Sequence, residues 1–256
     1  MSFGEAVLIL VAGIGAGTIN TIVGSGSLIT FPTLLFLGYP PIAANVSNNI
    51  GMVAGGIAGS VGYREELRGQ VGFIRRYGPV SFVGAILGAL LLLRLPASAF
   101  ATIVQVLILV ALALVVLGPR LQSAARGSQS GHPQPRWHTW ALAVGIFAAA
   151  VYGGYFGAAQ GVLLMGLLSV LSTEPLQRLN GFKNVLATIV NGVAAVTFLV
   201  VAPAQARGPA VGLIAVGAAI GGTLGATIGR RLSPRALRAI IVVIGVVAIA
   251  KLVWFP

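Results

Sequence analysis

Long apolar stretches alternate with short polar or basic connections along this chain. Residues 6–63 contain no charged side chain, and a bilayer crossing needs about 20 apolar residues, so this stretch alone exceeds two crossings. The pattern predicts eight apolar segments, at 5–37, 41–63, 77–93, 97–117, 137–172, 175–201, 209–229 and 234–253. We therefore expect an all-α polytopic membrane protein.

Two of these segments, 5–37 and 137–172, are too long for one helix and too short for two complete spans. Both are interrupted by glycines, at Gly24, Gly26, Gly153, Gly154, Gly157 and Gly161. We expect each segment to form a helix, an unwound turn and a second, shorter helix. Irregular backbone at membrane depth is tolerated where it is buried or lines a cavity. Two broken segments at matching places therefore indicate the binding site of a transporter.

The second half of the chain repeats the plan of the first. At an offset of 135 positions several residues match, namely Pro40 with Pro175, Asn45 with Asn180, Asn49 with Asn184, and Gly26 with Gly161. Between the halves lies a hydrophilic stretch rich in Gly, Pro, Ser and Gln, typical of a flexible linker. We therefore divide the chain into a first membrane repeat at 1–117, a linker at 118–136 and a second membrane repeat at 137–256.

The chain is strongly basic, with a net charge of +12 over 256 residues, of which 57% are hydrophobic and 8% charged. A basic balance can indicate a nucleic-acid partner. Here the Lys and Arg side chains gather in the connections, as topology signals do. We therefore expect the lipid bilayer, and no nucleic acid, as a partner.

The distribution of basic residues also favours one topology. If every segment crosses once, the 16 Lys and Arg residues divide nine against seven between the two sides. If segments 5–37 and 137–172 are hairpins that return to the side they entered, 13 of the 16 share one side. The positive-inside rule favours the hairpins. Each half then crosses an odd number of times, which predicts inverted repeats. We expect cytoplasmic basic loops and linker in a prokaryotic inner membrane, with both termini on the outer side.

Polar side chains gather around both breaks and at the starts of the segments that follow them. The predicted substrate-binding residues are Asn20, Ser25, Gly26, Asn45, Asn48, Asn49, Tyr155, Gln160, Gly161, Asn180, Lys183 and Asn184. Amide and hydroxyl donors with one cation suit a small oxyanion. Helix starts at the breaks would add backbone N–H groups with positive partial charge. The pattern predicts a site for a small anionic substrate, with a proton or another ion as an open coupling partner.

Lys183 is the strongest candidate for a substrate-binding residue, because the residue at the matching place of the first repeat is the neutral Asn48. An ionisable group inside a membrane is a functional hypothesis by default. The alternatives stay open: Lys183 could snorkel to the basic face, and the asparagines could cap helices or join them. A ladder of small residues, Gly217, Gly221, Gly225 and Gly229, predicts close packing, either within the molecule or in a homodimer.

Several chemistries are disfavoured by what the sequence holds. It contains no cysteine, and both histidines, His132 and His138, lie in or beside the linker. We therefore expect no metal site and no cofactor. No histidine lies within the apolar segments beside a serine, so no nucleophilic set is available. The sequence predicts a protein that is not an enzyme.

With these residues identified, the chain resembles the sulfite exporter TauE/SafE family, also called the toluene sulfonate uptake permease family. The resemblance rests on GAGTINTIVGSGSLITFPTLLFLG, PPIAANVSNN, GGYFGAAQGVLLM and LNGFKNVLATIVN. It implies a secondary transporter for a small sulfur-containing or organic anion, such as sulfite or an organosulfonate, working by alternating access. Two alternatives stay open. One is an anion channel without coupling, and the other is a membrane subunit that does not transport.

Overall fold

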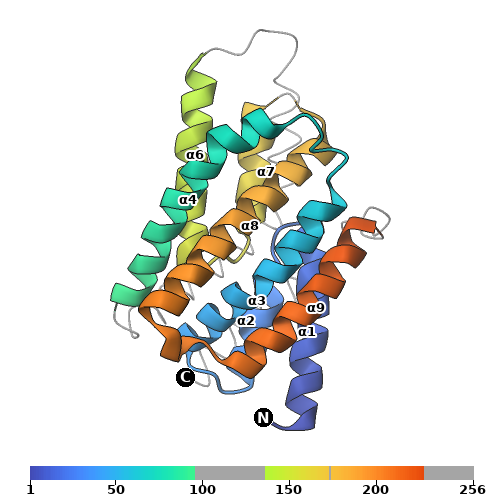
Figure 1. Cartoon of the computed structure of the whole chain (residues 1–256), viewed down its shortest axis with the longest axis vertical. Coiled ribbons are helices and arrows are strands. Elements are labelled where there is room, and N and C mark those ends of the chain that lie inside the picture. Colours follow the sequence, from blue (N-terminus) through green and yellow to red (C-terminus); the bar gives the residue numbers. More distant parts are fainter. Residues whose placement is uncertain (96–135, 173, 228–256) are drawn as a thin grey trace.

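A computed structural model describes residues 1–95, 136–172 and 174–227 (Figure 1). Within these ranges the chain is helical and contains no strand. Predicted segments 97–117 and 234–253, and almost all of the predicted linker, lie outside the described residues. Four of the described helices, α1, α4, α8 and α9, are long and apolar enough to cross a membrane. The prediction of an all-α polytopic membrane protein is confirmed.

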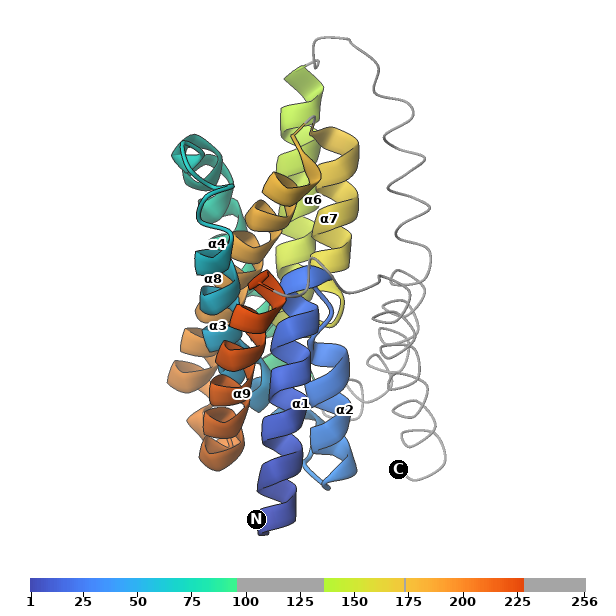
Figure 2. The same cartoon turned by 90° about the vertical axis from the view of Figure 1, so that its right-hand side faces the viewer.

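The first broken segment forms α1 (Phe3–Ile22) and α2 (Ser27–Phe36). Ser2 and Glu5 cap the start of α1 reciprocally, which satisfies two of its free N–H groups. After Ile22 the backbone turns at Gly24, whose φ of +87° favours glycine. Figure 2 shows α2 returning beside α1 toward the end of the molecule where the chain begins. The predicted helix, turn and short helix are confirmed here.

The second broken segment forms α6 (Arg136–Tyr155) and α7 (Gln160–Leu171). The turn between them holds Gly157 at a φ of +79° and Ala159 at +59°. Figure 2 shows this hairpin entering from the opposite end of the molecule. The prediction that the helix breaks at Gly153 and Gly154 is wrong. These glycines lie inside α6, where they leave room for the Gln160 side chain and the Ala85 carbonyl.

Four further helices surround the hairpins: α3 (Pro41–Gly62), α4 (Val71–Arg94), α8 (Leu176–Val201) and α9 (Gly208–Thr227). A short 3-10 turn, η1 (Pro203–Gln205), joins α8 to α9. The helices α3 and α8 each follow a proline at the N-cap, whose fixed φ suits a helix start. The helix α4 begins six residues before the predicted segment, so Arg75 and Arg76 lie in its first turns.

Glycine ladders let these helices pack closely. On α9, a Cβ at Gly217 or Gly221 would lie 2.5 or 2.0 Å from a carbonyl oxygen of α1. On α4, a Cβ at Gly88 would lie 2.1 Å from the Val151 carbonyl oxygen of α6. The described part of the predicted ladder therefore packs inside the molecule. Thus α9 of the second half packs against α1 of the first half, and α4 of the first half packs against α6 of the second half.

The connections sort to two ends of the molecule. Figure 1 shows the loop at 63–70, the start of α6, the end of α7 and the start of α8 at one end. The N-terminus, the turn at 37–40 and the connection at 202–207 lie at the other. This is the arrangement that the two hairpins require. Lys183 does not belong to the loops counted above, because it lies buried within α8. The symmetry relation between the halves stays a prediction.

Candidate functional site

The tips of the two hairpins meet. The N–H of Gly161 donates to the carbonyl oxygen of Gly24 at 3.0 Å. A Cβ on either glycine would lie 2.3 Å from the Cα of the other, so this contact requires glycine on both sides. The helices α2 and α7 begin beside this contact, at Ser27 and Gln160. Two helix N-termini, each carrying partial positive charge, therefore approach one region from opposite ends of the molecule.

The C-terminal end of α1 is capped by side chains of α8. The Nζ of Lys183 donates to the carbonyl oxygens of Asn20 and Thr21, both at 3.0 Å. Asn180 and Asn184 donate to the same Thr21 oxygen from their Nδ2 atoms, at 3.2 and 3.3 Å. Asn180 also donates to the Tyr63 hydroxyl at 2.7 Å. The last carbonyls of a helix lack intrahelical partners, and α8 supplies them here.

Lys183 does not snorkel to the surface. Its side chain is 1% exposed and points to the backbone of α1. It is the one charged side chain that is buried within the described residues. The snorkelling alternative is therefore wrong, while a direct contact of Lys183 with substrate stays a prediction.

The end of α6 is capped in a related way from the other half. Asn45 of α3 donates from its Nδ2 to the Tyr155 carbonyl oxygen at 2.9 Å. Asn48 faces α2 instead: it accepts a hydrogen bond from the Thr30 hydroxyl and donates to the Ser27 Oγ at 3.0 Å. Asn45 and its repeat mate Asn180 thus both bind the broken end of the opposite hairpin. The interhelical alternative for the asparagines is confirmed for Asn45, Asn48, Asn180 and Asn184.

Several buried polar atoms around the two breaks lack hydrogen-bond partners within the described part of the chain, including the Oδ1 atoms of Asn45 and Asn180 in the caps. Three others lie on the hairpin turns or face them. They are the Ser25 Oγ, the Asn49 Oδ1 and the Gln160 Nε2, on side chains that are 1%, 2% and 3% exposed. The Asn49 amide nitrogen lies 3.9 Å from where a Cβ on Gly157 would stand, and Gln160 lies over Gly153. Leaving such a group unpaired costs about 1–3 kcal/mol. A polar ligand at the tips would offset that cost.

The predicted residues fall into three groups. In the first group, Asn20 and Tyr155 each contribute a backbone carbonyl that accepts a hydrogen bond. The second group lies in the two caps: Asn45, Asn180, Lys183 and Asn184. The third group lies at the hairpin turns or against the short helices that follow them: Ser25, Gly26, Asn48, Asn49, Gln160 and Gly161. The sequence prediction missed Tyr63 and Thr30, which hold Asn180 and Asn48. Neither carries a distinguishing signal, because Tyr63 ends a predicted segment and Thr30 is one hydroxyl in an apolar helix.

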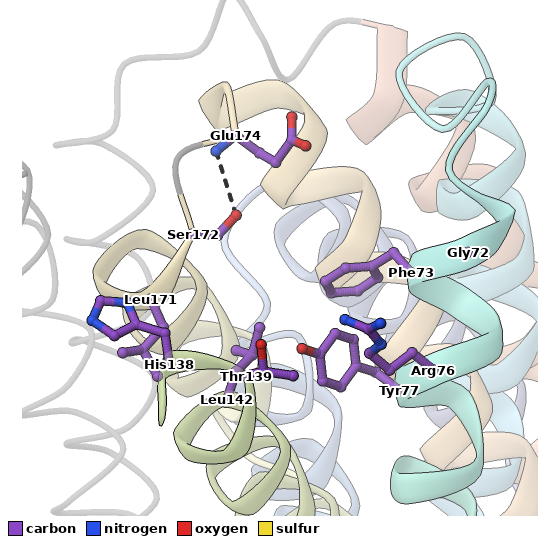
Figure 3. Close-up of a pocket in the computed structure, with 10 residues that line it drawn as sticks. All are labelled: Gly72, Phe73, Arg76, Tyr77, His138, Thr139, Leu142, Leu171, Ser172 and Glu174. Carbon is purple, nitrogen blue, oxygen red and sulfur yellow. Dashed lines mark hydrogen bonds between the residues drawn. The ribbon is translucent and has the colours of Figure 1, made fainter. Parts of the chain in front are cut away.

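A cavity of about 370 Å³ opens away from the tips, at the end where α4 and α6 begin (Figure 3). Its lining includes Arg76 and Tyr77 of α4, Thr139 of α6 and Ser172 at the end of α7. In Figure 3 the Tyr77 hydroxyl points toward Thr139, and His138 is turned away from Arg76. No predicted site residue lines this cavity.

Glu174, at the edge of this cavity, forms an ion pair with Arg178 one helical turn later, at 2.5 Å. Arg178 also donates from its Nε to the Glu66 carbonyl oxygen at 3.3 Å. These contacts join the start of α8 to the loop after α3. Glu174 therefore has a structural partner at the start of a helix, where an acidic side chain is favourable.

Comparison with known proteins places the chain in a family. The model of the sulfite exporter TauE/SafE family matches residues 9–252. The chain belongs to this family. Among similar proteins, a probable membrane transporter protein, ORF9, from Sinorhizobium sp is 29% identical over 168 residues, which are 64% of this chain and 61% of the relative. The probable membrane transporter protein YfcA from Escherichia coli (strain K12) is 26% identical over 177 residues, which are 66% and 64%. No solved structure matches.

These alignments span less than two thirds of each relative's own length. Family membership accounts for the apolar, all-helical chain and confirms the resemblance carried by its motifs. The motifs that carry the resemblance, at 15–38, 40–49, 153–165 and 179–191, include both hairpin turns and parts of α3 and α8.

Proposed function

We propose that this member of the TauE/SafE family is a secondary membrane transporter for a small sulfur-containing or organic anion, such as sulfite or an organosulfonate. The observation that carries the proposal is the meeting of two helix N-termini at the hairpin tips. In broken-helix transporters, such N-termini point at anionic groups of the substrate. The family match and the names of the relatives support the same class of function.

The substrate would bind at the tips rather than at the helix caps. Ser25, Asn49 and Gln160 hold buried polar groups that lack a partner within the described residues. The Ser25 hydroxyl and the Gln160 amide can both donate to an oxyanion. Lys183 lies with its ammonium on the end of α1 and adds positive charge to the same region. Transport by alternating access would require the tip contact between Gly24 and Gly161 to open and close.

A thermal-shift screen of purified protein tests the binding site. Candidate ligands are sulfite, sulfate, thiosulfate, sulfoacetate, taurine and small carboxylates. A ligand that binds only the folded state stabilises it by about 2.7 kcal/mol at 100 times its Kd, so the melting temperature should rise by several degrees. Ser25→Ala should abolish the rise. Ser169→Ala is the matched control, because Ser169 is also 1% exposed and its Oγ also lacks a partner within the described residues, but it lies far along α7.

Exchange measurements in proteoliposomes separate the transporter from its rivals. Counterflow of a labelled anion that binds in the screen should be saturable and should require the same anion on the other side. Conduction that grows without saturation and needs no exchange would favour an anion channel. Binding without any flux would favour a membrane subunit that does not transport.

A further inference from the structure

The end of α1 is a concentrated acceptor site inside the bundle. The carbonyl oxygen of Thr21 accepts from three nitrogen donors, on Lys183, Asn180 and Asn184, at 3.0 to 3.3 Å. The carbonyl oxygen of Asn20 accepts from Lys183 as well. A helix C-terminus carries a partial negative charge of about half an elementary charge. The site is therefore built to hold a positive charge.

This position has a known chemistry in transporters with broken helices. Carbonyls at the C-terminal ends of half-helices coordinate the coupling Na⁺ or proton. Here the two carbonyls face an ammonium group that belongs to the protein itself. The amides of Asn180 and Asn184 point their nitrogens, not their oxygens, at Thr21. A metal cation needs oxygen ligands, so these amides complete the site for Lys183 rather than for Na⁺.

No carboxylate competes for the ammonium of Lys183. Among the described residues, no Asp or Glu side chain is buried, and Glu174 pairs with Arg178 at the start of α8. The nearest titratable group in the network is the Tyr63 hydroxyl, which accepts from Asn180. The end of α1 is therefore the counter-charge of Lys183.

The second hairpin has no such cation. The Tyr155 carbonyl at the end of α6 accepts from the neutral amide of Asn45. Asn48, the repeat mate of Lys183, is turned toward Ser27 and Thr30 of α2. Among the described residues, a buried positive charge therefore caps the first hairpin and not the second. A general need to cap a broken helix does not explain it, since a neutral amide caps the other.

We propose that the ammonium of Lys183 is a tethered cation in the place that a coupling sodium ion takes in other transporters with broken helices, so that the protein binds and moves its substrate without Na⁺. The claim that this site replaces a coupling ion rests on the proposed function. The occupation of the site by Lys183 does not, because it can be measured in the absence of any substrate.

The test measures melting temperatures of purified protein in sodium chloride, methylammonium chloride and choline chloride at equal concentration. Wild type should melt at the same temperature in all three salts. Lys183→Ala removes the Lys183 donor from the Asn20 carbonyl and one of the three donors from the Thr21 carbonyl, and leaves space beside them. It should melt lower in choline or sodium chloride and recover in methylammonium chloride, because methylammonium has N–H donors like the Lys183 ammonium, choline has none, and the two amide nitrogens do not suit Na⁺. Lys183→Met is the matched control. It fills the space without charge and should melt alike in all three salts.

Two results would overturn the proposal. One is a rise in the wild-type melting temperature that is specific to Na⁺, and the other is a Lys183→Ala protein that responds equally to the three cations. Should Lys183→Ala give no folded protein, the wild-type comparison still decides, because a Na⁺-specific rise in its melting temperature would overturn the proposal. A failed anion screen leaves these results unchanged, so failure of the proposed function is distinguishable from failure of this inference.

Discussion

Single buried side chains at the helix breaks do two different jobs. Asn45, Asn180 and Lys183 bind backbone carbonyls that the broken helices leave without partners. Ser25 and Gln160 instead keep polar atoms unpaired within the described residues. Satisfying a carbonyl explains a polar residue by stability alone. Within the same part of the chain, an unpaired Oδ1 also remains on Asn45 and Asn180, but an amide oxygen only accepts hydrogen bonds, whereas the Ser25 hydroxyl and the Gln160 Nε2 can donate to an anion. Substrate contact by Ser25 and Gln160 therefore stays our prediction.

The tip contact gives a prediction for one residue. Gly161 lies in α7 with an ordinary helical backbone, so Gly161→Ala adds a methyl group without backbone strain. That methyl would stand 2.3 Å from the Gly24 Cα, and the tips would have to separate. We expect a loss of stability of about 1–3 kcal/mol, typical of overpacking, and loss of anion exchange in proteoliposomes.

Gly166→Ala is the matched control for this substitution. It lies in the same helix, and a Cβ there would meet nothing within 4 Å. Alanine is favoured over glycine in a helix by about 1 kcal/mol, so melting temperature and exchange should be unchanged or slightly improved. Equal behaviour of the two variants would mean that the tips do not depend on their close contact.

At the scale of helices, α9 is wedged between α1 and α3. Gly221 contacts the backbone of α1, while Gly222 lies against the Gly55 carbonyl of α3. Packing of this kind relies on small residues, because lipid offers no hydrophobic drive for helices to associate. The α9 ladder therefore fixes the position of the first hairpin relative to the rest of the molecule.

This packing predicts the response of α9 to added methyl groups. In Gly221→Ala the new Cβ would lie 2.0 Å from the Ile14 carbonyl oxygen, so α1 must move away. We expect the free energy of unfolding to fall by about 1–3 kcal/mol. Gly212→Ala is the matched control on the same helix, because a Cβ there would meet nothing within 4 Å. It should leave the free energy of unfolding unchanged. Denaturant titrations in one detergent compare the two. If Gly221→Ala proves as stable as Gly212→Ala, α9 does not pack on α1 through this ladder.

The sequence predicted the helices better than their contacts. Apolar length and the prolines at 40 and 175 placed α3 and α8 within a residue of their observed starts. The helix break predicted at Gly153 and Gly154 was wrong, because the sequence does not distinguish a glycine that makes room for a neighbouring group from a glycine that forms a turn. The two helix caps could not be predicted from the sequence, because their hydrogen-bond acceptors are the backbone carbonyls of Thr21 and Tyr155. Which side chain meets a carbonyl depends on packing between helices far apart in the chain.

At the scale of the whole molecule, the two halves interlock. The helix α4 of the first half packs on α6, and α9 of the second half packs on α1. The hairpins enter from opposite ends and meet at their tips (Figure 2). Motion of one half against the other would therefore change the tip contact and the packing of both hairpins together. That linkage is what alternating access at the tips requires.

The topology of the molecule can be tested directly, because the chain contains no cysteine and a single introduced thiol reports without background. Glu65 follows α3 and Ala204 lies between α8 and α9, and both are exposed. With two hairpins these positions lie on opposite sides of the membrane. With eight single crossings they would share a side.

The positive-inside rule places the basic loop with Glu65 in the cytoplasm. In intact cells, an impermeant maleimide should therefore label Ala204→Cys at once, and Glu65→Cys only after permeabilisation. Labelling of both variants from one side would exclude the hairpins as membrane elements and, with them, a binding site where their tips meet.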